Sequence, residues 1–298
     1  MPSTAPATEH PVTLPDGRVL VLHQTGDPDG VPVVTHHGTP EGGTVYAPHA
    51  QDAAARGLRL ISYDRAGYGG STRDAGRDVA AVAADVGAAL DAIGVGEFLT
   101  WGVSGGGPHA LACAALLPDR VRAVASIAGV APWDAEGLDP MEGMGEDNVE
   151  EFGLALQGEG PLRPLLEAFR DSVLTTTSAQ LAEQMRSILA PVDVRALSGD
   201  AGDHLHASMV AGLARGVDGW LDDDLAFVRP WGFDLASIAV PVLVQQGGQD
   251  LMVPAAHGPW LAGHLPGATG WFEPDQGHLS ITLDIGRVHA WLLGHWPG

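Results

Sequence analysis

Short apolar runs alternate with longer segments of helical periodicity over the first 130 residues. The apolar runs and helical segments follow one another as strand 18–22, strand 31–35, helix 48–56, strand 58–63, helix 78–93, strand 98–102, helix 105–117 and strand 121–128. Such alternation is typical of a parallel sheet with crossover helices. The turn Pro15-Asp16-Gly17 before the first run predicts a hairpin near the N-terminus.

The pattern changes between residues 131 and 236, where several amphipathic helical segments are separated by Gly, Pro and Asp clusters. The alternation then returns with strand 240–246, helix 255–265, strand 270–273 and helix 279–293. The chain is therefore predicted to be an α/β protein with a mostly parallel, doubly wound sheet. Residues 1–130 and 237–298 form its core, and residues 131–236 form an inserted helical cap.

The composition of the chain mainly excludes certain classes of partner. The chain has 298 residues, of which 45% are hydrophobic and 17% charged, enough for a large core. Its 15 basic residues are all arginine and stand against 37 carboxylates, so the formal charge is −22. Nucleic acid and anionic membrane surfaces need clustered cationic side chains, and we therefore expect neither as a partner. The charge pattern says nothing about the oligomeric state.

Cysteine usage and the N-terminal segment bear on the compartment. Cys113 is the one cysteine, which excludes an internal disulfide. The N-terminal segment has neither the basic flank nor the apolar run of a secretory signal. No stretch reaches the roughly 20 apolar residues of a membrane span. The sequence thus predicts a soluble, cytoplasmic protein.

The strand 98–102 leads directly into Gly102-Val103-Ser104-Gly105-Gly106, and a helix follows at once. This is the GxSxG pattern in the strand-turn-helix context that it requires. A serine in so tight a turn takes a strained backbone conformation, and glycines beside it let neighbouring elements pass closely. The motif alone is a weak signal, but its context makes Ser104 a candidate nucleophile.

Two further residues follow in the order expected of a nucleophile's partners. Asp250 comes just after strand 240–246, where open parallel sheets keep their sites. His278 precedes the last helix, after the turn that ends at Gly277. The order serine, aspartate, histidine matches a nucleophile, an orienting acid and a general base. Asp134, just beyond strand 121–128, is the alternative orienting acid.

An oxyanion hole needs two backbone N–H donors. Gly105 supplies one, because it stands at the N-terminus of the helix behind Ser104. The loop His36-His37-Gly38-Thr39-Pro40 follows strand 31–35, and Thr39 is the candidate for the second donor. The two histidines of this loop, like His109, are interpreted as structural residues.

These motifs together resemble the α/β hydrolase superfamily, in its cap-bearing serine hydrolase branch. The matching segments are His37-Gly38-Thr39-Pro40, Asp64-Arg65-Ala66-Gly67-Tyr68-Gly69-Gly70-Ser71, the turn around Ser104, Gly247-Gly248-Gln249-Asp250 and Gly277-His278. The chain departs from the family pattern at Ala66, where proline is usual, and at Glu41, where glycine is frequent. The resemblance implies an α/β-hydrolase fold, a Ser104, Asp250 and His278 triad, oxyanion donors at Thr39 and Gly105, and no cofactor or metal.

The function expected first is hydrolysis of small or medium carboxylic esters through an acyl-enzyme, with a small-molecule ester or amide as substrate. A serine at position 104 excludes the aspartate nucleophile of dehalogenases and epoxide hydrolases of this fold. Proline iminopeptidases share the architecture, but they usually carry HGGPG where this chain has HGTPE. The same residues are compatible with a carbon–carbon bond hydrolase, and the same fold is compatible with a ligand-binding protein.

Two charged clusters in the predicted cap have simpler interpretations. The carboxylates Glu142, Glu146, Asp147, Glu150 and Glu151 are interpreted as a solvated helix face, and the alternative is that some of them bind a substrate ammonium group. His204 and His206 lie two apart on a predicted helix and therefore point to different faces, which argues against a metal site.

Overall fold

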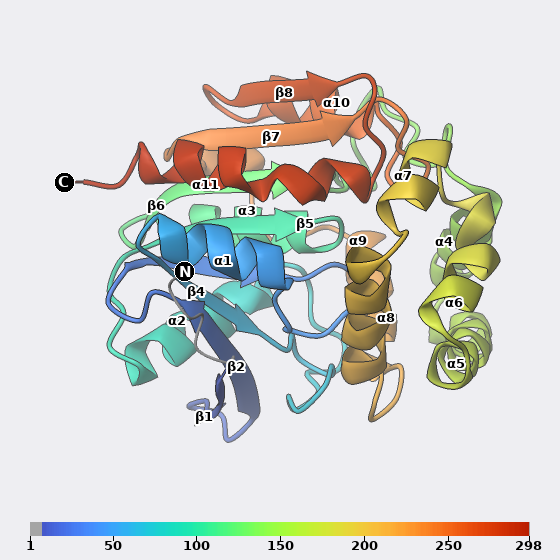
Figure 1. Ribbon diagram of the computed structural model, residues 1–298, viewed down its shortest axis with the longest axis horizontal. Coiled ribbons are helices and arrows are strands. Elements are labelled where there is room, and N and C mark those ends of the chain that lie inside the picture. The colour runs from blue at the N-terminus through green and yellow to red at the C-terminus, as the bar shows by residue number, and fades with distance from the viewer. Residues whose placement is uncertain (1–7, 298) are drawn as a thin grey trace.

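The computed structural model describes residues 8–297, and eight strands in it form one mostly parallel sheet (Figure 1). The strands are β1 (Thr8–Thr13), β2 (Val19–Gly26), β3 (Val31–His36), β4 (Leu58–Tyr63), β5 (Phe98–Val103), β6 (Val121–Ile127), β7 (Val242–Gly247) and β8 (Thr269–Glu273). Their order is β1-β2-β4-β3-β5-β6-β7-β8, and β2 runs antiparallel to both of its neighbours. The predicted α/β class is confirmed.

The first two strands form the predicted hairpin, with Thr13 paired to Val19. Gly17 in its turn has a φ of 88°, a conformation that favours glycine. The hairpin therefore follows from the local sequence of the turn.

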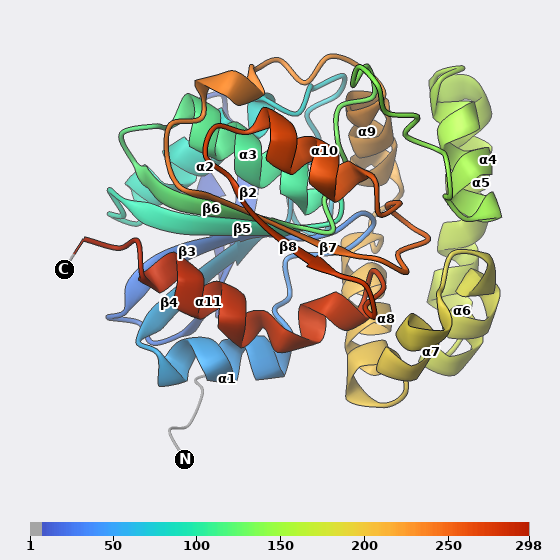
Figure 2. The same ribbon diagram turned by 90° about the horizontal axis from the view of Figure 1, so that it is seen from above.

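Helices cover both faces of the sheet (Figure 2). α1 (Ala47–Ala55) and α11 (Ile285–Leu293) lie on one face, and α2 (Ala81–Ala92), α3 (Gly106–Leu116) and α10 (His257–His264) lie on the other. Each face has its own apolar cluster, the first including Ala53 and Val288 and the second Val86 and Leu111. Because the central strands are buried on both faces, they read as continuous apolar runs rather than alternating ones.

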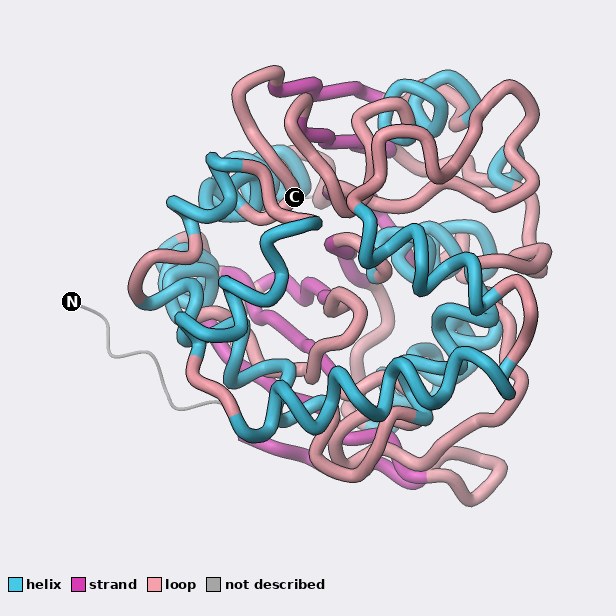
Figure 3. Tube along the Cα trace, turned by 90° about the vertical axis from the view of Figure 1, so that its right-hand side faces the viewer, coloured by secondary structure: helices cyan, strands magenta, loops and turns pink. Residues whose placement is uncertain are grey.

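A group of helices between β6 and β7, here called the inserted helices, comprises α4 (Glu146–Ala155), α5 (Glu159–Thr175), α6 (Ser178–Gln184), η1 (Met185–Ser187), α7 (Pro191–Ala196), α8 (Asp200–Gly212) and α9 (Asp218–Phe227). They lie beyond the carboxyl ends of the parallel strands, and Figure 3 views the molecule from that side. Leu162, Leu166 and Leu221 belong to a third apolar cluster, which packs these helices together. The group thus covers the edge of the sheet where sites form in this class.

Two short 3-10 helices complete the described chain, η2 (Leu235–Ser237) and η3 (Ser280–Asp284). The last predicted helix, 279–293, therefore begins as a 3-10 turn and continues as α11. Within residues 8–297, every helix is too short or too polar to cross a membrane.

Candidate active site

Ser104 stands between the end of β5 and the start of α3 with a φ of 55°. This left-handed conformation is strained for any residue other than glycine. A Cβ at Gly102 would lie 2.1 Å from the carbonyl oxygen of Gly106, and a Cβ at Gly106 would lie 2.2 Å from that of His36. Only glycine fits at these two positions, so the two glycines of the GxSxG motif are required by steric contacts.

The side chain of His278 is joined to Asp250. Its Nδ1 lies 2.8 Å from Oδ2 of Asp250, and both residues are buried. The other oxygen of Asp250 accepts the N–H groups of Met252 and Val253, while Gln246 Nε2 donates to Oδ2 at 3.0 Å. The carboxylate is thus held from four directions and fixes the ring. Asp134, the alternative partner, is exposed.

The charges around His278 favour its protonated form. Burial lowers the pKa of His278, but the Asp250 carboxylate, together with Asp193 and Glu41, more than offsets this effect. The net pKa of His278 therefore lies above its usual value. A ring with this pKa can accept a proton from a neighbouring hydroxyl and return it.

Thr39 and Gly105 lie against each other. A Cβ at Gly105 would lie 2.4 Å from Oγ1 of Thr39 and 3.0 Å from the ring of Phe227. In the part of the chain that the structure describes, neither the Thr39 N–H nor the Gly105 N–H donates a hydrogen bond to a backbone or side-chain acceptor. Two unused N–H donors near Ser104 are what an oxyanion hole requires.

The loop that carries Thr39 is held by a buried ion-pair cluster that no sequence motif revealed. Asp223 of α9 is fully buried, and its Oδ2 accepts from Arg65 Nη2 at 2.5 Å, Thr39 Oγ1 at 2.8 Å and the Tyr68 hydroxyl at 2.8 Å. Arg77 donates to its Oδ1 at 2.6 Å. Burial raises the pKa of Asp223, but the two guanidinium groups hold it well below its usual value. An inserted helix is thereby tied to the loop beside Ser104.

Arg65 also binds that loop directly. Its Nη1 donates to the carbonyl oxygen of His37 at 2.9 Å, and its backbone N–H donates to Nε2 of the same histidine at 3.1 Å. The ring of His37 therefore carries its proton on Nδ1 and donates to the Gly38 carbonyl at 2.7 Å. Burial and the Arg65 charge lower the pKa of His37 to about 3, so the ring is neutral and structural.

The other two histidines interpreted from the sequence as structural are fully buried, whereas His37 is half-buried. His36 lies between the hydroxyls of Tyr63 and Thr100, at 2.7 Å and 3.0 Å. Nε2 of His109 lies 3.4 Å from Oδ1 of Asp223, and burial with the Arg65 charge lowers its pKa to about 4. His109 is thus a residue of the interior, whereas His36 has a structural role and also lines the apolar cavity described next.

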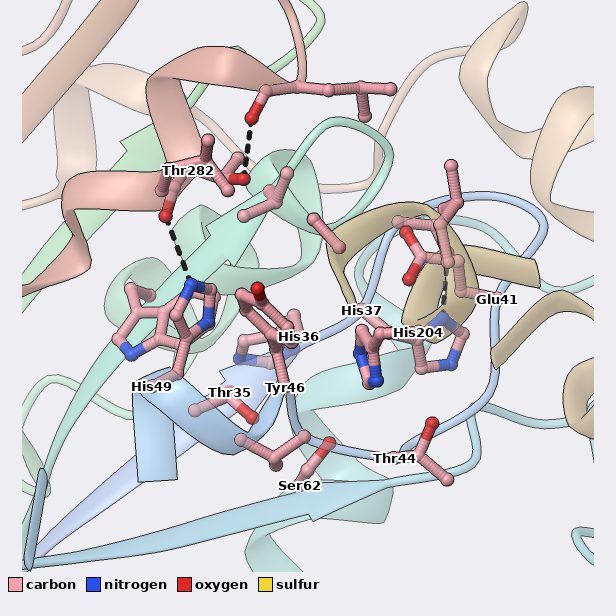
Figure 4. A pocket seen from close by; sticks show the side chains of 18 of the residues that line it. Thr35, His36, His37, Glu41, Thr44, Tyr46, His49, Ser62, His204 and Thr282 are labelled. Carbon is pink, nitrogen blue, oxygen red and sulfur yellow. Dashed lines mark hydrogen bonds between the residues drawn. The ribbon is translucent and has the colours of Figure 1, made fainter. Parts of the chain in front are cut away.

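An apolar cavity lies between the sheet and α7 and α8. Figure 4 shows it from close by, with His49 and Thr282 on one side and Glu41 and His204 on the other. Its wall includes Val103 and Leu279, the chain neighbours of Ser104 and His278. The remaining wall is mainly aliphatic and aromatic, with Val45, Tyr46, Trp101, Leu197, Leu205 and Leu283.

A second cavity, here called the acidic cavity, lies under the inserted helices. Four carboxylates line it: Glu41, Asp147, Glu150 and Glu151. Three of them belong to the cluster interpreted from the sequence as a solvated helix face, and of these Asp147 and Glu150 are exposed while Glu151 is half-buried. Glu142 and Glu146 of that cluster are exposed and lie outside the wall.

Glu41 links the two cavities, because it lines both of them. A Cβ at Gly38 would lie 2.6 Å from Oε1 of Glu41 and 3.7 Å from Cβ of Ser104, so the carboxyl group and the serine flank the same glycine. Burial raises the pKa of Glu41. The departure from the family pattern at this position thus places an acid in the site.

Across residues 8–297, no three or more His, Cys, Asp or Glu side chains are grouped so that they could hold a metal ion. His204 lines the apolar cavity and lies against the ring of Tyr46, while His206 contacts the carbonyl oxygen of Val173.

Comparison with known proteins places this geometry in context. A family model described as alpha/beta hydrolase fold matches residues 31–284. A non-heme haloperoxidase from Rhodococcus erythropolis is 27% identical over 290 residues, which cover 95% of this chain and 97% of the relative. A thermophilic esterase from Thermogutta terrifontis has the same fold, with a TM-score of 0.69, 21% identity and coverage of 98% of this chain and 100% of that chain.

A second relative matches over a shorter region. A non-heme chloroperoxidase from Streptomyces lividans is 32% identical over 147 residues, which are 49% of this chain. The match spans about half of that relative, 53% of its length.

Proposed function

Because the chain belongs to the alpha/beta hydrolase fold family, we propose that it hydrolyses small or medium carboxylic esters with Ser104, His278 and Asp250 as a catalytic triad. The observation that carries this proposal is the buried hydrogen bond of 2.8 Å between His278 and Asp250, in a chain whose only GxSxG turn is strained at its serine. The inserted helices act as a cap over this site.

The proposed mechanism is acyl transfer. Asp250 accepts a hydrogen bond from Nδ1–H of His278, and this tautomer leaves Nε2 free to take the proton of Ser104 as the serine oxygen attacks the ester carbonyl. The N–H groups of Thr39 and Gly105 stabilise the oxyanion, and His278 then protonates the leaving alcohol. Water then replaces the alcohol: His278 takes its proton as the water oxygen attacks the acyl carbon, the bond to the Ser104 oxygen breaks, and His278 returns the proton to Ser104 as the carboxylic acid leaves. The reaction needs no cofactor.

The apolar cavity supports a substrate with an apolar portion of moderate size. It begins at the neighbours of Ser104 and His278, and burial holds its histidines in the neutral form by lowering the pKa of each ring. A cavity that contains no charged side chain other than Glu41 favours an aliphatic or aromatic group over a charged one.

The acidic cavity favours a second candidate function, hydrolysis of an amide or ester that carries an ammonium group. Three carboxylates on α4 and Glu41 on the loop beside Ser104 line one cavity, and an ammonium group between them gains charge-assisted hydrogen bonds. An aminopeptidase similar to the proline iminopeptidases is the enzyme class that this observation supports.

The test is turnover of a p-nitrophenyl acyl ester series beside proline p-nitroanilide, in the native protein and in Ser104→Ala. We expect ester turnover, and a fall in kcat on the order of 10⁶-fold in the variant. The matched control is Ser237→Ala, which removes an exposed hydroxyl outside the walls of both cavities. We expect this variant to keep full activity.

Each outcome assigns the function differently. Turnover of the anilide that depends on Ser104 would promote the aminopeptidase over the esterase. Ester turnover that survives Ser104→Ala would reject the triad, and absence of turnover on both substrates would favour a ligand-binding protein on this fold.

A further inference from the structure

We propose that Asp193, which is carried by the inserted helix α7, is a positioning residue that holds His278 in its catalytic orientation. This inference rests on the proposed function, because it concerns the residue assigned there as the general base. Nothing in the motifs of the chain points to Asp193, which lies within the segment predicted as a cap.

The geometry of the contact is that of a carboxylate capping three backbone donors. Oδ2 of Asp193 accepts the N–H of His278 at 2.9 Å, and Oδ1 accepts those of Leu279 and Ser280 at 3.0 Å and 2.8 Å. The carboxylate is fully buried. Figure 2 shows α7 beside the segment that leads into α11.

These three N–H groups are donors that the chain itself leaves free. They precede and open η3, and the first N–H groups of a helical turn have no partner within it. A buried donor without an acceptor is costly, so the turn needs a group from elsewhere. Asp193 supplies it, and the backbone of His278 is fixed as a consequence.

The chain makes room for this contact. A Cβ at Gly277 would lie 2.3 Å from Oδ2 of Asp193, so only glycine lets the carboxylate approach the backbone. The glycine before the catalytic histidine thus has a steric reason that involves an inserted helix. The Gly277 N–H in turn donates to Oγ of Ser280 at 2.8 Å, which closes the turn.

The contact also places a charge near the imidazole. Three carboxyl groups act on His278: Asp250 from the loop after β7, Asp193 from α7 and Glu41 from the loop after β3. Asp250 accepts a hydrogen bond from the imidazole ring of His278, whereas Asp193 accepts one from the backbone N–H of the same residue. Removing the Asp193 charge therefore weakens the protonated form of the ring without touching the hydrogen bond that orients it.

The first test is Asp193→Asn, assayed with the ester that the native protein turns over best. The amide NH₂ cannot accept a backbone N–H, so at least one of the three bonds is lost. We expect kcat to fall by about tenfold to 10²-fold, as for a small misplacement of a catalytic group, with a much smaller change in KM. The acid limb of the pH profile of kcat/KM moves to lower pH, because His278 loses a neighbouring negative charge.

A second variant separates charge from position. Asp193→Glu keeps the charge but moves the oxygens by one methylene, so we expect a lower kcat with the acid limb close to its native pH. It also carries the test if Asp193→Asn fails to fold. The control Asp203→Asn removes an exposed carboxylate from the neighbouring helix α8. We expect it to leave kcat and the acid limb of the pH profile of kcat/KM unchanged.

The inference is overturned if Asp193→Asn folds and keeps the native kcat and acid limb. Titration of the His278 imidazole by NMR needs no turnover, and the same downward movement of its pKa in Asp193→Asn is expected there. If the native protein shows no Ser104-dependent turnover, the proposed function fails, and the NMR titration still decides whether Asp193 acts on His278.

Discussion

Ser104 and Ala128 are the two residues other than glycine with positive φ within residues 8–297. They follow neighbouring strands, β5 and β6, at the same edge of the sheet. The strain at Ser104 could be predicted, because glycines at 102, 105 and 106 announce a tight turn. Nothing local marks Ala128, whose N–H donates to the carbonyl oxygen of Gln245 on β7, so its conformation depends on a contact formed only in the folded sheet.

The pKa of His278 gives a prediction at this scale. General-base catalysis requires the neutral ring, and the folded protein holds the pKa above the usual value of about 6.5. We therefore expect kcat/KM to rise with pH through a midpoint above that value and to be lost below it. The measurement is the pH profile of ester hydrolysis. His295→Gln, which removes an exposed histidine, should leave the midpoint in place. A midpoint at or below the usual value would contradict the arrangement of carboxylates around the ring.

The candidate site could be predicted from the sequence only in part. Asp250 and His278 follow strand ends, and this position in the alternating pattern is what revealed them. Asp223, Asp193 and Glu41 gave no such signal, because each acts through a partner far away in the sequence or across a turn. The sequence feature available at this place is the run Asp222-Asp223-Asp224. All three aspartates prove to be buried on α9, although such a run is normally exposed on a helix.

At the scale of elements, α9 is joined to the core through Asp223. Replacing Asp223 with asparagine leaves Arg65 and Arg77 buried without a compensating charge. We expect a loss of about 3–5 kcal/mol in the free energy of unfolding, the usual effect of breaking a buried pair. Urea unfolding of the two proteins measures it.

The matched control is Asp218→Asn at the start of the same helix. Asp218 pairs with Arg73 and Arg163 but is 41% exposed, so its loss should cost less than about 1 kcal/mol. Equal effects of the two variants would show that the buried pair contributes no more than an exposed one.

The predicted bounds of an element agree with the observed ones where the element is buried along its whole length. They differ where a residue far away in the sequence binds the end of the element. Strand 58–63 was predicted at its observed bounds, because it is buried on both faces. The final helix was predicted from residue 279 as one α-helix, yet it opens as a 3-10 turn whose first N–H groups are taken by Asp193. No periodicity within 279–293 contains that information.

At the scale of the whole molecule, the charge of −22 and the acidic cavity act in the same direction. The negative electrostatic potential of the whole molecule adds to that of the negatively charged site, and together they raise the local concentration of cationic substrates. We expect an amino-acid p-nitrophenyl ester with a free ammonium group to be preferred over its N-acetyl counterpart. The preference should fall several-fold between about 10 mM and about 150 mM salt, as the Debye length drops from about 30 Å to about 8 Å.

The measurement is the ratio of kcat/KM for the two esters at each salt concentration. Glu41→Gln should lower the ratio at low salt, because the Glu41 carboxyl group and Ser104 flank the same glycine. A ratio that does not respond to salt would mean that the acidic cavity does not receive the substrate.

The buried cluster around Asp223 limits how this molecule can be redesigned. Substrate preference in such a protein is often sought by exchanging the helices over the site as a cassette. Here the cassette carries the counter-ion of two arginines that remain in the core, and it carries the acceptor for the loop of His278. A transplanted set of helices will support this core only if it brings aspartates to the places of Asp223 and Asp193.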